Sequence, residues 1–270
     1  MFGELIAARL AAAEADTTLS WAYRKNLKCM LTRAAGVLGN LPAAEVGPAE
    51  VGEVVALGKS GSWQRSMRAM LSGVYNEAIR AGVLATNYAT LARVMRDKRP
   101  DAGVGILTPA QARALLREVS GSAMAAPVAI QLFAGLRRAE AMRLDWCEVK
   151  LARGFIEVTA GKSKTVTRRL VTIQPNLAKI LAPLAKPKGK VWTVPEREWK
   201  KWHATLGLPP NGMRHSFVSY HLALFEDVAK TELEAGHDRK VLFQHYRELA
   251  TPEDAEKYFA LPGRPAKKAR

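Results

Sequence analysis

The chain has 270 residues and is 48% hydrophobic, enough to build one large domain or two modest ones. Its 41 Lys and Arg outnumber its 25 Asp and Glu, which gives a net charge of +16, and the first 100 residues and the remainder are both positive. This composition favours a nucleic-acid partner, whereas two isolated cysteines and the lack of any apolar run near about 20 residues argue against a zinc site and a membrane span.

Residues 1–99 are predicted to form a helical domain. Four helices are expected there, over residues 5–13, 19–38, 63–81 and 87–96. Thr17 or Thr18 is the expected cap of the second helix, and Ser60 begins the turn that precedes the third.

The predicted helices of this domain are amphipathic. Their apolar spacing assigns Trp21, Met67 and Met70 to the core. Several cationic side chains fall on the opposite faces, where together they could follow the phosphate backbone of DNA. These DNA-binding candidates are Arg24, Lys25, Lys28, Arg65 and Arg68.

A linker is predicted at residues 100–105, followed by a mixed α+β domain over 106–262 and a basic tail over 263–270. The domain opens on Thr108, which is a natural N-cap, and Gln111 is placed to complete a capping box. Helices are expected over 109–119, 124–134, 137–143, 175–183, 195–205, 211–224, 229–235 and 239–247. The fold class is therefore mainly α with a small antiparallel β-sheet.

Two short segments of the second domain alternate between apolar and polar residues, as β-strands do. They are 155–159 and 169–173. The turn between them carries Lys162 and Lys164, and Lys164 joins the residues expected to bind DNA. The pattern predicts a β-hairpin with lysines at its tip.

Side chains suited to binding one phosphate occur in three blocks. The blocks are Gly135-Leu-Arg137-Arg-Ala-Glu140, then Asn211-Gly-Met-Arg214-His215-Ser-Phe, and last Gly236-His237 with Tyr246 nine residues later. Arg137 and Arg214 could grip the non-bridging oxygens and stabilise the extra charge of a pentavalent transition state. A tyrosine placed in line with the leaving oxygen can attack phosphorus. The combination points to cutting and rejoining DNA without a metal ion or other cofactor.

These blocks, in this order, resemble those of the tyrosine recombinases, the phage-integrase family. The resemblance covers roughly residues 105–260 in detail, whereas residues 1–99 match only the family's helical domain in general terms. It implies a helical, SAM-like core-binding domain that binds DNA, followed by a mixed α+β catalytic domain.

The resemblance also implies a role for each motif residue. Tyr246 would become linked to a 3′ phosphate, and Lys162 is the candidate acid for the leaving 5′ oxygen. His237 would contact the phosphate or assist proton movement. Glu140 is expected to orient the first arginine, and His215 to pack or to form a hydrogen bond.

Three of these assignments have a rival nearby in the sequence. The rivals are Arg138 for Arg137, Lys164 for Lys162, and Tyr220 or Tyr258 for Tyr246. The preceding Gly-Leu pair favours the first of the two arginines, and the nine-residue offset from the histidine favours Tyr246.

Asn211 departs from the family pattern, which usually has a histidine three residues before the second arginine. An amide can donate a hydrogen bond to a phosphate oxygen, but it cannot shuttle a proton. We therefore expect Asn211 to contact the phosphate with some loss of rate.

The resemblance implies a site-specific recombinase or integrase of DNA-associated, cytoplasmic location that works through a 3′-phosphotyrosine intermediate without metal or ATP. Double-stranded DNA is the expected partner, with four protomers on paired recombination sites. The segment 252–270, which begins with a predicted helix, is expected to dock on a neighbouring protomer. Two alternatives stay open, a catalytically impaired DNA-binding regulator and a type IB topoisomerase-like enzyme.

Overall fold

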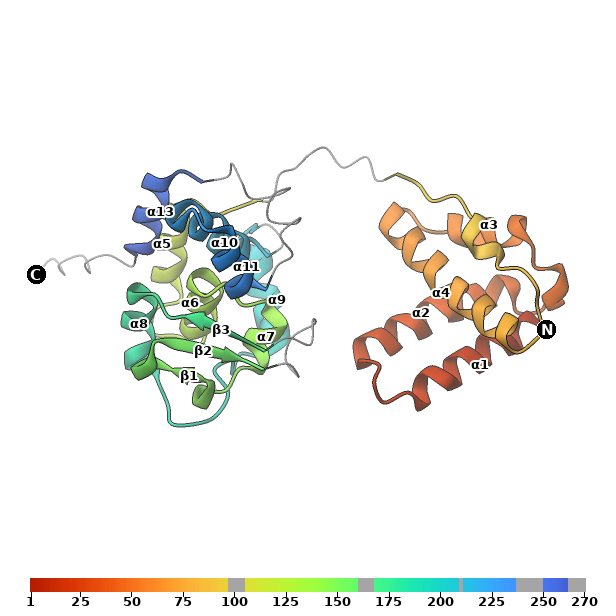
Figure 1. Ribbon diagram of the computed structural model, residues 1–270, viewed down its shortest axis with the longest axis horizontal. Coiled ribbons are helices and arrows are strands. Elements are labelled where there is room, and N and C mark those ends of the chain that lie inside the picture. Colours follow the sequence, from red (N-terminus) through yellow and green to blue (C-terminus); the bar gives the residue numbers. More distant parts are fainter. Residues whose placement is uncertain (97–104, 160–167, 209–210, 237–249, 262–270) are drawn as a thin grey trace, which may run out of the picture. The chain divides into compact units, whose positions relative to one another are not determined.

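The computed structural model describes residues 1–96, 105–159, 168–208, 211–236 and 250–261 (Figure 1). The chain divides into two compact units, Met1–Pro100 and Asp101–Arg270. Each unit has its own hydrophobic core. Within the described residues, no helix is long and apolar enough to cross a membrane.

The first unit is all helical. Its helices are α1 (Phe2–Ala15), α2 (Trp21–Leu38), α3 (Pro48–Ala56) and α4 (Gly61–Arg80), with 3-10 turns at Ala43–Glu45 and Tyr88–Leu91. The hydroxyls of Ser20 and Ser60 accept hydrogen bonds from the main chain three residues on and so cap α2 and α4. Leu31 and Leu71 are fully buried where these helices meet.

The first unit differs from its prediction in several places. The cap of α2 is Ser20, not Thr17 or Thr18, and α3 was not predicted. The helix predicted over 87–96 is reduced to a 3-10 turn at Tyr88–Leu91, and side chains of α4 hold the backbone that follows it. There, Met95 N donates to the Gln64 side chain at 2.8 Å, and the Arg68 side chain donates to the Ala92 carbonyl at 3.4 Å.

The second unit is mixed. Its helices are α5 (Pro109–Glu118), α6 (Ala125–Phe133), α7 (Arg138–Arg143), α8 (Pro175–Leu181), α9 (Glu196–Thr205), α10 (Gly212–Phe225), α11 (Val228–Ala235) and α13 (Pro252–Phe259). Its strands are β1 (Val149–Lys150), β2 (Phe155–Val158) and β3 (Arg169–Thr172). The predicted capping box of α5 forms, since Thr108 and Gln111 exchange hydrogen bonds at 2.8 and 3.2 Å.

The core of this unit surrounds α6, every residue of which is buried. The sheet is antiparallel with the order β1-β2-β3, and Ile156 pairs with Val171 on its buried face. The predicted hairpin is therefore present as β2 and β3, and β1 adds a third strand that was not predicted. The fold class is mainly α with a small antiparallel sheet, as the sequence predicts.

Helix α13 packs on its own unit, beside α5 and α10 (Figure 1). The Tyr258 ring stacks on Tyr220 with centroids 4.2 Å apart, and its hydroxyl donates to the Leu132 carbonyl at 2.6 Å. Ala255 and Leu261 are also buried. The apolar face of 252–259 is thus covered within the chain, whereas residues 262–270 of the segment expected to dock on a neighbour lie outside the described residues.

Candidate functional site

Arg137 stands at the start of α7 and is held by a carboxylate one turn later. Glu140, 2% exposed, accepts hydrogen bonds from the Arg137 main-chain nitrogen at 2.8 Å and from Arg137 Nη1 at 3.0 Å. The Arg137 side chain is 27% exposed. Its position and orientation are therefore fixed while part of the guanidinium faces solvent.

Arg214 lies in the first turn of α10 and is 4% exposed. Its guanidinium donates to the Gly135 carbonyl, two residues before Arg137. Gly135 has a φ of +60°, and a Cβ at this position would lie 2.2 Å from the ring of Phe217. The two arginine blocks therefore fit against each other only because residue 135 is glycine.

Both arginines donate hydrogen bonds to the carbonyl groups at the end of α11. A helix leaves its last carbonyls without intrahelical partners, and they carry partial negative charge. Arg214 Nη2 donates to the Ala235 carbonyl at 2.6 Å, and Arg137 Nη2 donates to the Gly236 carbonyl at 2.5 Å. Gly236 itself ends the helix in the left-handed conformation, with a φ of +63°. Two arginines 77 positions apart in sequence thus converge at the residue that precedes His237.

A third arginine, which was not predicted from the sequence, also donates a hydrogen bond to the end of α11. Arg169, the first residue of β3, donates from Nε to the Glu234 carbonyl at 2.9 Å. Its other two nitrogens donate to the two oxygens of Glu140, at 3.1 and 2.7 Å. The three consecutive carbonyls 234–236 therefore each accept from a different arginine. The only sequence signal was that Arg169 shares the inward face of its strand with Val171.

The electrostatics of Glu140 follow from these contacts. Burial by itself raises the pKa of the carboxyl, but the hydrogen bonds and charges of Arg169 and Arg137 outweigh burial and hold the pKa at about 2. The carboxylate is therefore ionised at neutral pH, and two arginines share it.

Asn211 is the N-cap of α10, has a φ of +57° and is exposed. Its side chain makes no cap hydrogen bond, and its carbonyl accepts from the main chain of His215 at 2.9 Å. His215 is half-buried on the same helix. Asn211 thus lies one helical turn from Arg214, as the spacing predicts.

Four predicted site residues lie outside the described residues. They are Lys162, Lys164, His237 and Tyr246. The rivals of the last one are described: Tyr220 and Tyr258 are buried, and their hydroxyls donate to main-chain carbonyls at 3.0 and 2.6 Å. Burial raises the pKa of Tyr220 to about 12. Neither phenol is placed to attack an external phosphate.

Arg138, the rival of Arg137, points elsewhere. Its guanidinium pairs with the exposed Glu196 at 3.2 Å, at the start of α9. Among the described residues, no group of three or more His, Cys, Asp or Glu could hold a metal ion.

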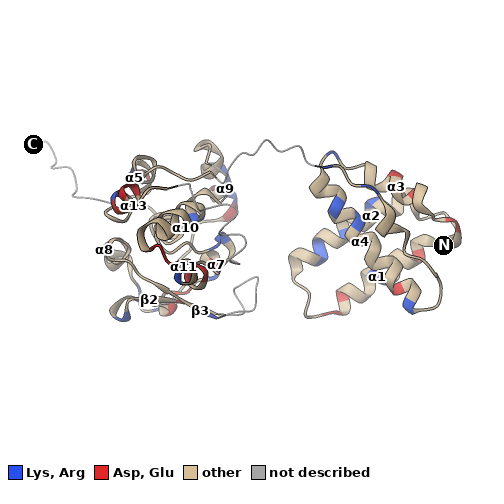
Figure 2. Cartoon of the chain, turned by 45° about the horizontal axis from the view of Figure 1, so that its top comes forward, with Lys and Arg blue, Asp and Glu red and all other residues tan. Residues whose placement is uncertain are grey.

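The predicted DNA-binding residues of the first unit avoid its core, and Figure 2 shows Lys and Arg on α2 and α4. Lys25, Lys28 and Arg65 are exposed, whereas Arg24 and Arg68 are half-buried.

Trp21, which was assigned to the core, is instead 68% exposed, and the Lys25 ammonium lies 4.9 Å from the centre of its ring. Helical spacing places Trp21 on the face of Arg24 and Lys28, which explains the error.

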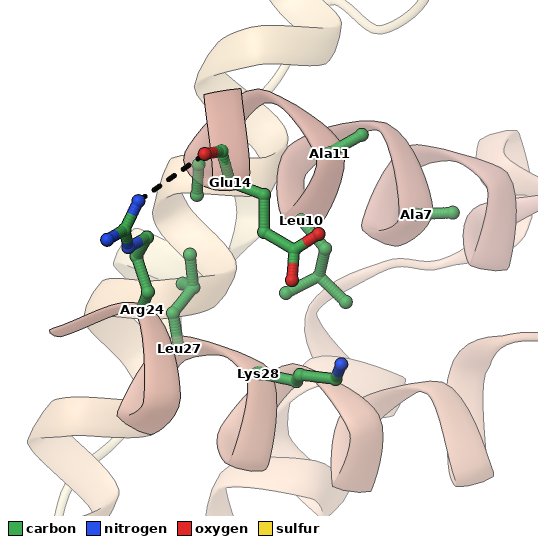
Figure 3. Close-up of a pocket in the computed structure, with 8 residues that line it drawn as sticks. Ala7, Leu10, Ala11, Glu14, Arg24, Leu27 and Lys28 are labelled. Carbon is green, nitrogen blue, oxygen red and sulfur yellow. Dashed lines mark hydrogen bonds between the residues drawn. The ribbon is translucent and has the colours of Figure 1, made fainter. Parts of the chain in front are cut away.

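A groove between α1 and α2 borders this basic face (Figure 3). Arg24 reaches across it to donate to the main-chain oxygen of Glu14 at 3.4 Å, and Lys28 lines the α2 side. Glu14 adds a carboxylate to the same groove, so the surface is cationic with one acidic group.

Comparison with known proteins gives a match in structure only. No protein-family model and no curated protein matches the sequence. The Tn1549 transposon integrase bound to transposon right-end DNA superposes with a TM-score of 0.70 at 18% identity, over 94% of this chain and 97% of that one.

Lambda integrase gives two similar matches. Its DNA-bound form (residues 75–356) superposes with a TM-score of 0.70 at 14% identity, over 92% of this chain and 95% of that one. Its tetramer on a Holliday junction gives 0.71 at 13% identity, over 92% and 79%. The chain has the fold of these integrases.

Proposed function

We propose that the chain is a site-specific DNA recombinase, or integrase, that cleaves and rejoins strands through a 3′-phosphotyrosine intermediate. The observation that carries the proposal is the convergence of Arg137 and Arg214 on the carbonyls of residues 236 and 235. Two fixed guanidinium groups beside the segment that leads to His237 suit a scissile phosphate. The fold shared with DNA-bound integrases supports the same reading.

The two arginines would interact with the phosphate in different ways. Arg137 is partly exposed, and its two side-chain hydrogen bonds leave other N–H groups for a non-bridging oxygen. Arg214 is nearly buried and would add a fixed positive charge beside Arg137. Positive charge held in place before reaction stabilises the pentavalent transition state at little reorganisation cost.

The remaining groups would move protons and form the covalent bond. Tyr246 would attack phosphorus and pass its phenolic proton to His237, and the displaced 5′ oxygen would take a proton from Lys162. Asn211 would donate a hydrogen bond to a phosphate oxygen. The phosphotyrosine ester keeps the energy of the broken bond, so that an incoming 5′ hydroxyl reverses the step and restores Tyr246.

Tyr246 is favoured as the nucleophile by elimination as well as by its spacing. The chain has six tyrosines, of which only Tyr220, Tyr246 and Tyr258 lie in the second unit. The hydroxyls of Tyr220 and Tyr258 donate hydrogen bonds to main-chain carbonyls in the core, which leaves Tyr246 as the candidate.

Double-stranded DNA is the proposed partner of both units. The first unit would contact its backbone through Arg24, Lys25, Lys28, Arg65 and Arg68, and the second through the site and the hairpin lysines. Recombination joins two duplexes and cuts two strands in each, so we propose four protomers on paired sites, the number in the lambda integrase tetramer on its Holliday junction.

Capture of a covalent adduct tests the proposal. The chain is incubated with a pool of nicked duplexes that carry a randomised core, so that the short strand released by cleavage diffuses away. A protein–DNA band stable to denaturing electrophoresis is expected from the wild type, and Tyr246→Phe should abolish it. Tyr23→Phe, which removes an exposed phenol of α2, is the matched control and should keep the band.

The other outcomes identify the alternatives. Tight DNA binding without any adduct would favour a DNA-binding regulator of the same fold. An adduct accompanied by relaxation of supercoiled plasmid, with no dependence on a second site, would favour a type IB topoisomerase-like enzyme.

A further inference from the structure

Arg169 is a buried arginine that the proposed mechanism does not use. It begins β3, and its side chain is 8% exposed. Each of its three nitrogens has a partner: Nε donates to the Glu234 carbonyl, and Nη1 and Nη2 donate to the two oxygens of Glu140. A guanidinium with every nitrogen engaged and little exposure is not placed to bind a phosphate itself.

The carboxylate of Glu140 is shared between this arginine and Arg137. Oε1 accepts from Arg137 Nη1 at 3.0 Å and Arg169 Nη1 at 3.1 Å, and Oε2 accepts from the Arg137 main chain at 2.8 Å and Arg169 Nη2 at 2.7 Å. An Arg137–Glu140 pair alone would be neutral. Two guanidinium groups around one carboxylate leave one positive charge, and Arg137 is the more exposed of the two.

Strand β3 also fixes the end of α11. Arg169 holds the carbonyl of Glu234, and Thr172 Oγ1 donates to the carboxylate of the same residue at 2.8 Å. The guanidinium of Arg169 lies so close to Gly236 that a Cβ there would come within 3.3 Å of it. The last turn of α11, and with it the start of the segment that leads to His237, is thus anchored to the strand.

We propose that Arg169 is a positioning residue of the strand-cleavage reaction. It acts through Glu140 on the orientation and net charge of Arg137, and it fixes the end of α11, the element that precedes His237 in the sequence. The inference rests on the proposed function and deepens it, because it assigns a role to a residue that would not touch the DNA.

The test measures DNA binding and the first-turnover rate of adduct formation separately, on the duplex selected from the nicked pool. Arg169→Met keeps the length of the side chain and removes the charge, and Arg169→Lys keeps the charge and loses the fork. Arg168→Met is the matched control, because its side chain is 68% exposed and pairs with Glu157 on the neighbouring strand. Thermal unfolding checks each variant.

In Arg169→Met, the adduct rate at saturating DNA should fall about 100-fold, the scale expected when a catalytic group is misplaced by about 1 Å, while the Kd for the duplex stays close to the wild-type value. Arg169→Lys should recover part of the rate, and Arg168→Met should retain it. A split between rate and affinity, with partial rescue by lysine, would not arise from a general loss of stability.

Arg169→Met leaves the Glu140 carboxylate with one partner fewer and could unfold the unit. The double variant Arg169→Met/Glu140→Gln removes that buried charge and is expected to fold. It restores one positive charge at Arg137 but not the orientation of its side chain, so its adduct rate should stay below that of the wild type. An Arg169→Met rate equal to that of the wild type, an equal loss in Arg168→Met, or a loss confined to Kd overturns the inference alone. A wild-type chain that forms no adduct overturns the proposed function with it.

Discussion

Gly135 is the residue on which the contact between the two arginine blocks depends. Its φ of +60° costs an L-residue about 1–2 kcal/mol, and a methyl group would also strike the fully buried ring of Phe217. We expect Gly135→Ala to lower the free energy of unfolding by about 3 kcal/mol or more, as urea titration would measure, and to reduce the adduct rate.

Gly121→Ala is the control for that substitution. Gly121 has a similar φ of +74°, but an added Cβ would meet nothing within 4 Å. It should lose only the backbone contribution of about 1–2 kcal/mol. Equal losses at the two positions would show that the Phe217 contact is unimportant.

Glu140 sets a pH dependence of stability. Its pKa is about 2 in the folded chain and about 4.3 in an unfolded one, so its ionised form favours folding by about 3 kcal/mol. A carboxyl with a lowered pKa gives this stabilisation in full above about pH 5 and loses it as the pH falls toward 2. Urea unfolding of wild type and Glu140→Gln should therefore differ most at pH 7, and the difference should shrink below pH 5.

The exposed Glu45 provides the comparison. Glu45→Gln should track the wild type across the whole range. A Glu140→Gln curve that runs parallel to the wild type down to pH 3 would contradict the paired carboxylate that the structure places between Arg137 and Arg169.

At the scale of elements, α13 is an integral part of the second unit. Removing the buried Tyr258 ring takes away its stacking on Tyr220, so Tyr258→Ala should cost about 3–5 kcal/mol. Tyr258→Phe removes only the hydrogen bond to the Leu132 carbonyl and should cost about 1–2 kcal/mol. Lys257→Ala, one residue away and 66% exposed, should stay within about 0.5 kcal/mol in the same unfolding assay.

Elements with strong local signals could be predicted from the sequence. Thr108 and Gln111 mark the start of α5 by their own hydrogen bonds, and β2 and β3 alternate in hydrophobicity because one face is buried. The short helix α3 has nine residues, too few for a clear period, and its apolar Val51, Val54 and Val55 follow a Gly-Pro pair typical of a loop. Residues 87–96 depend on Gln64 and Arg68 of another helix, which no local pattern reveals.

The candidate site also contains residues that the sequence predicts and one that it does not. Arg137, Arg214 and Glu140 stand in recognisable blocks, and the structure brings them together. Arg169 has no such block, because its role follows from a carboxylate 29 positions away and a helix end 65 positions away. A charged residue at the start of a strand ordinarily faces solvent. Arg169 is buried because α11 packs against β3.

For the whole molecule, the net charge of +16 predicts DNA binding that weakens steeply with salt, since each phosphate contact releases condensed counterions. Lys25 and Lys28 are exposed on one face of α2. If both bind phosphates, Lys25→Ala/Lys28→Ala in the full chain should reduce the slope of log K against log salt by about 2 and weaken binding to every duplex alike.

The exposed pair Lys186 and Lys188 lies in the second unit, outside the proposed contacts, and removes the same formal charge when substituted. Fluorescence-anisotropy titrations of Lys186→Ala/Lys188→Ala should keep the wild-type slope. A slope that falls equally in both double variants would mean that the net charge of the chain governs affinity and that α2 makes no specific backbone contacts. A change confined to the α2 variant would assign the first unit a direct part in holding the duplex.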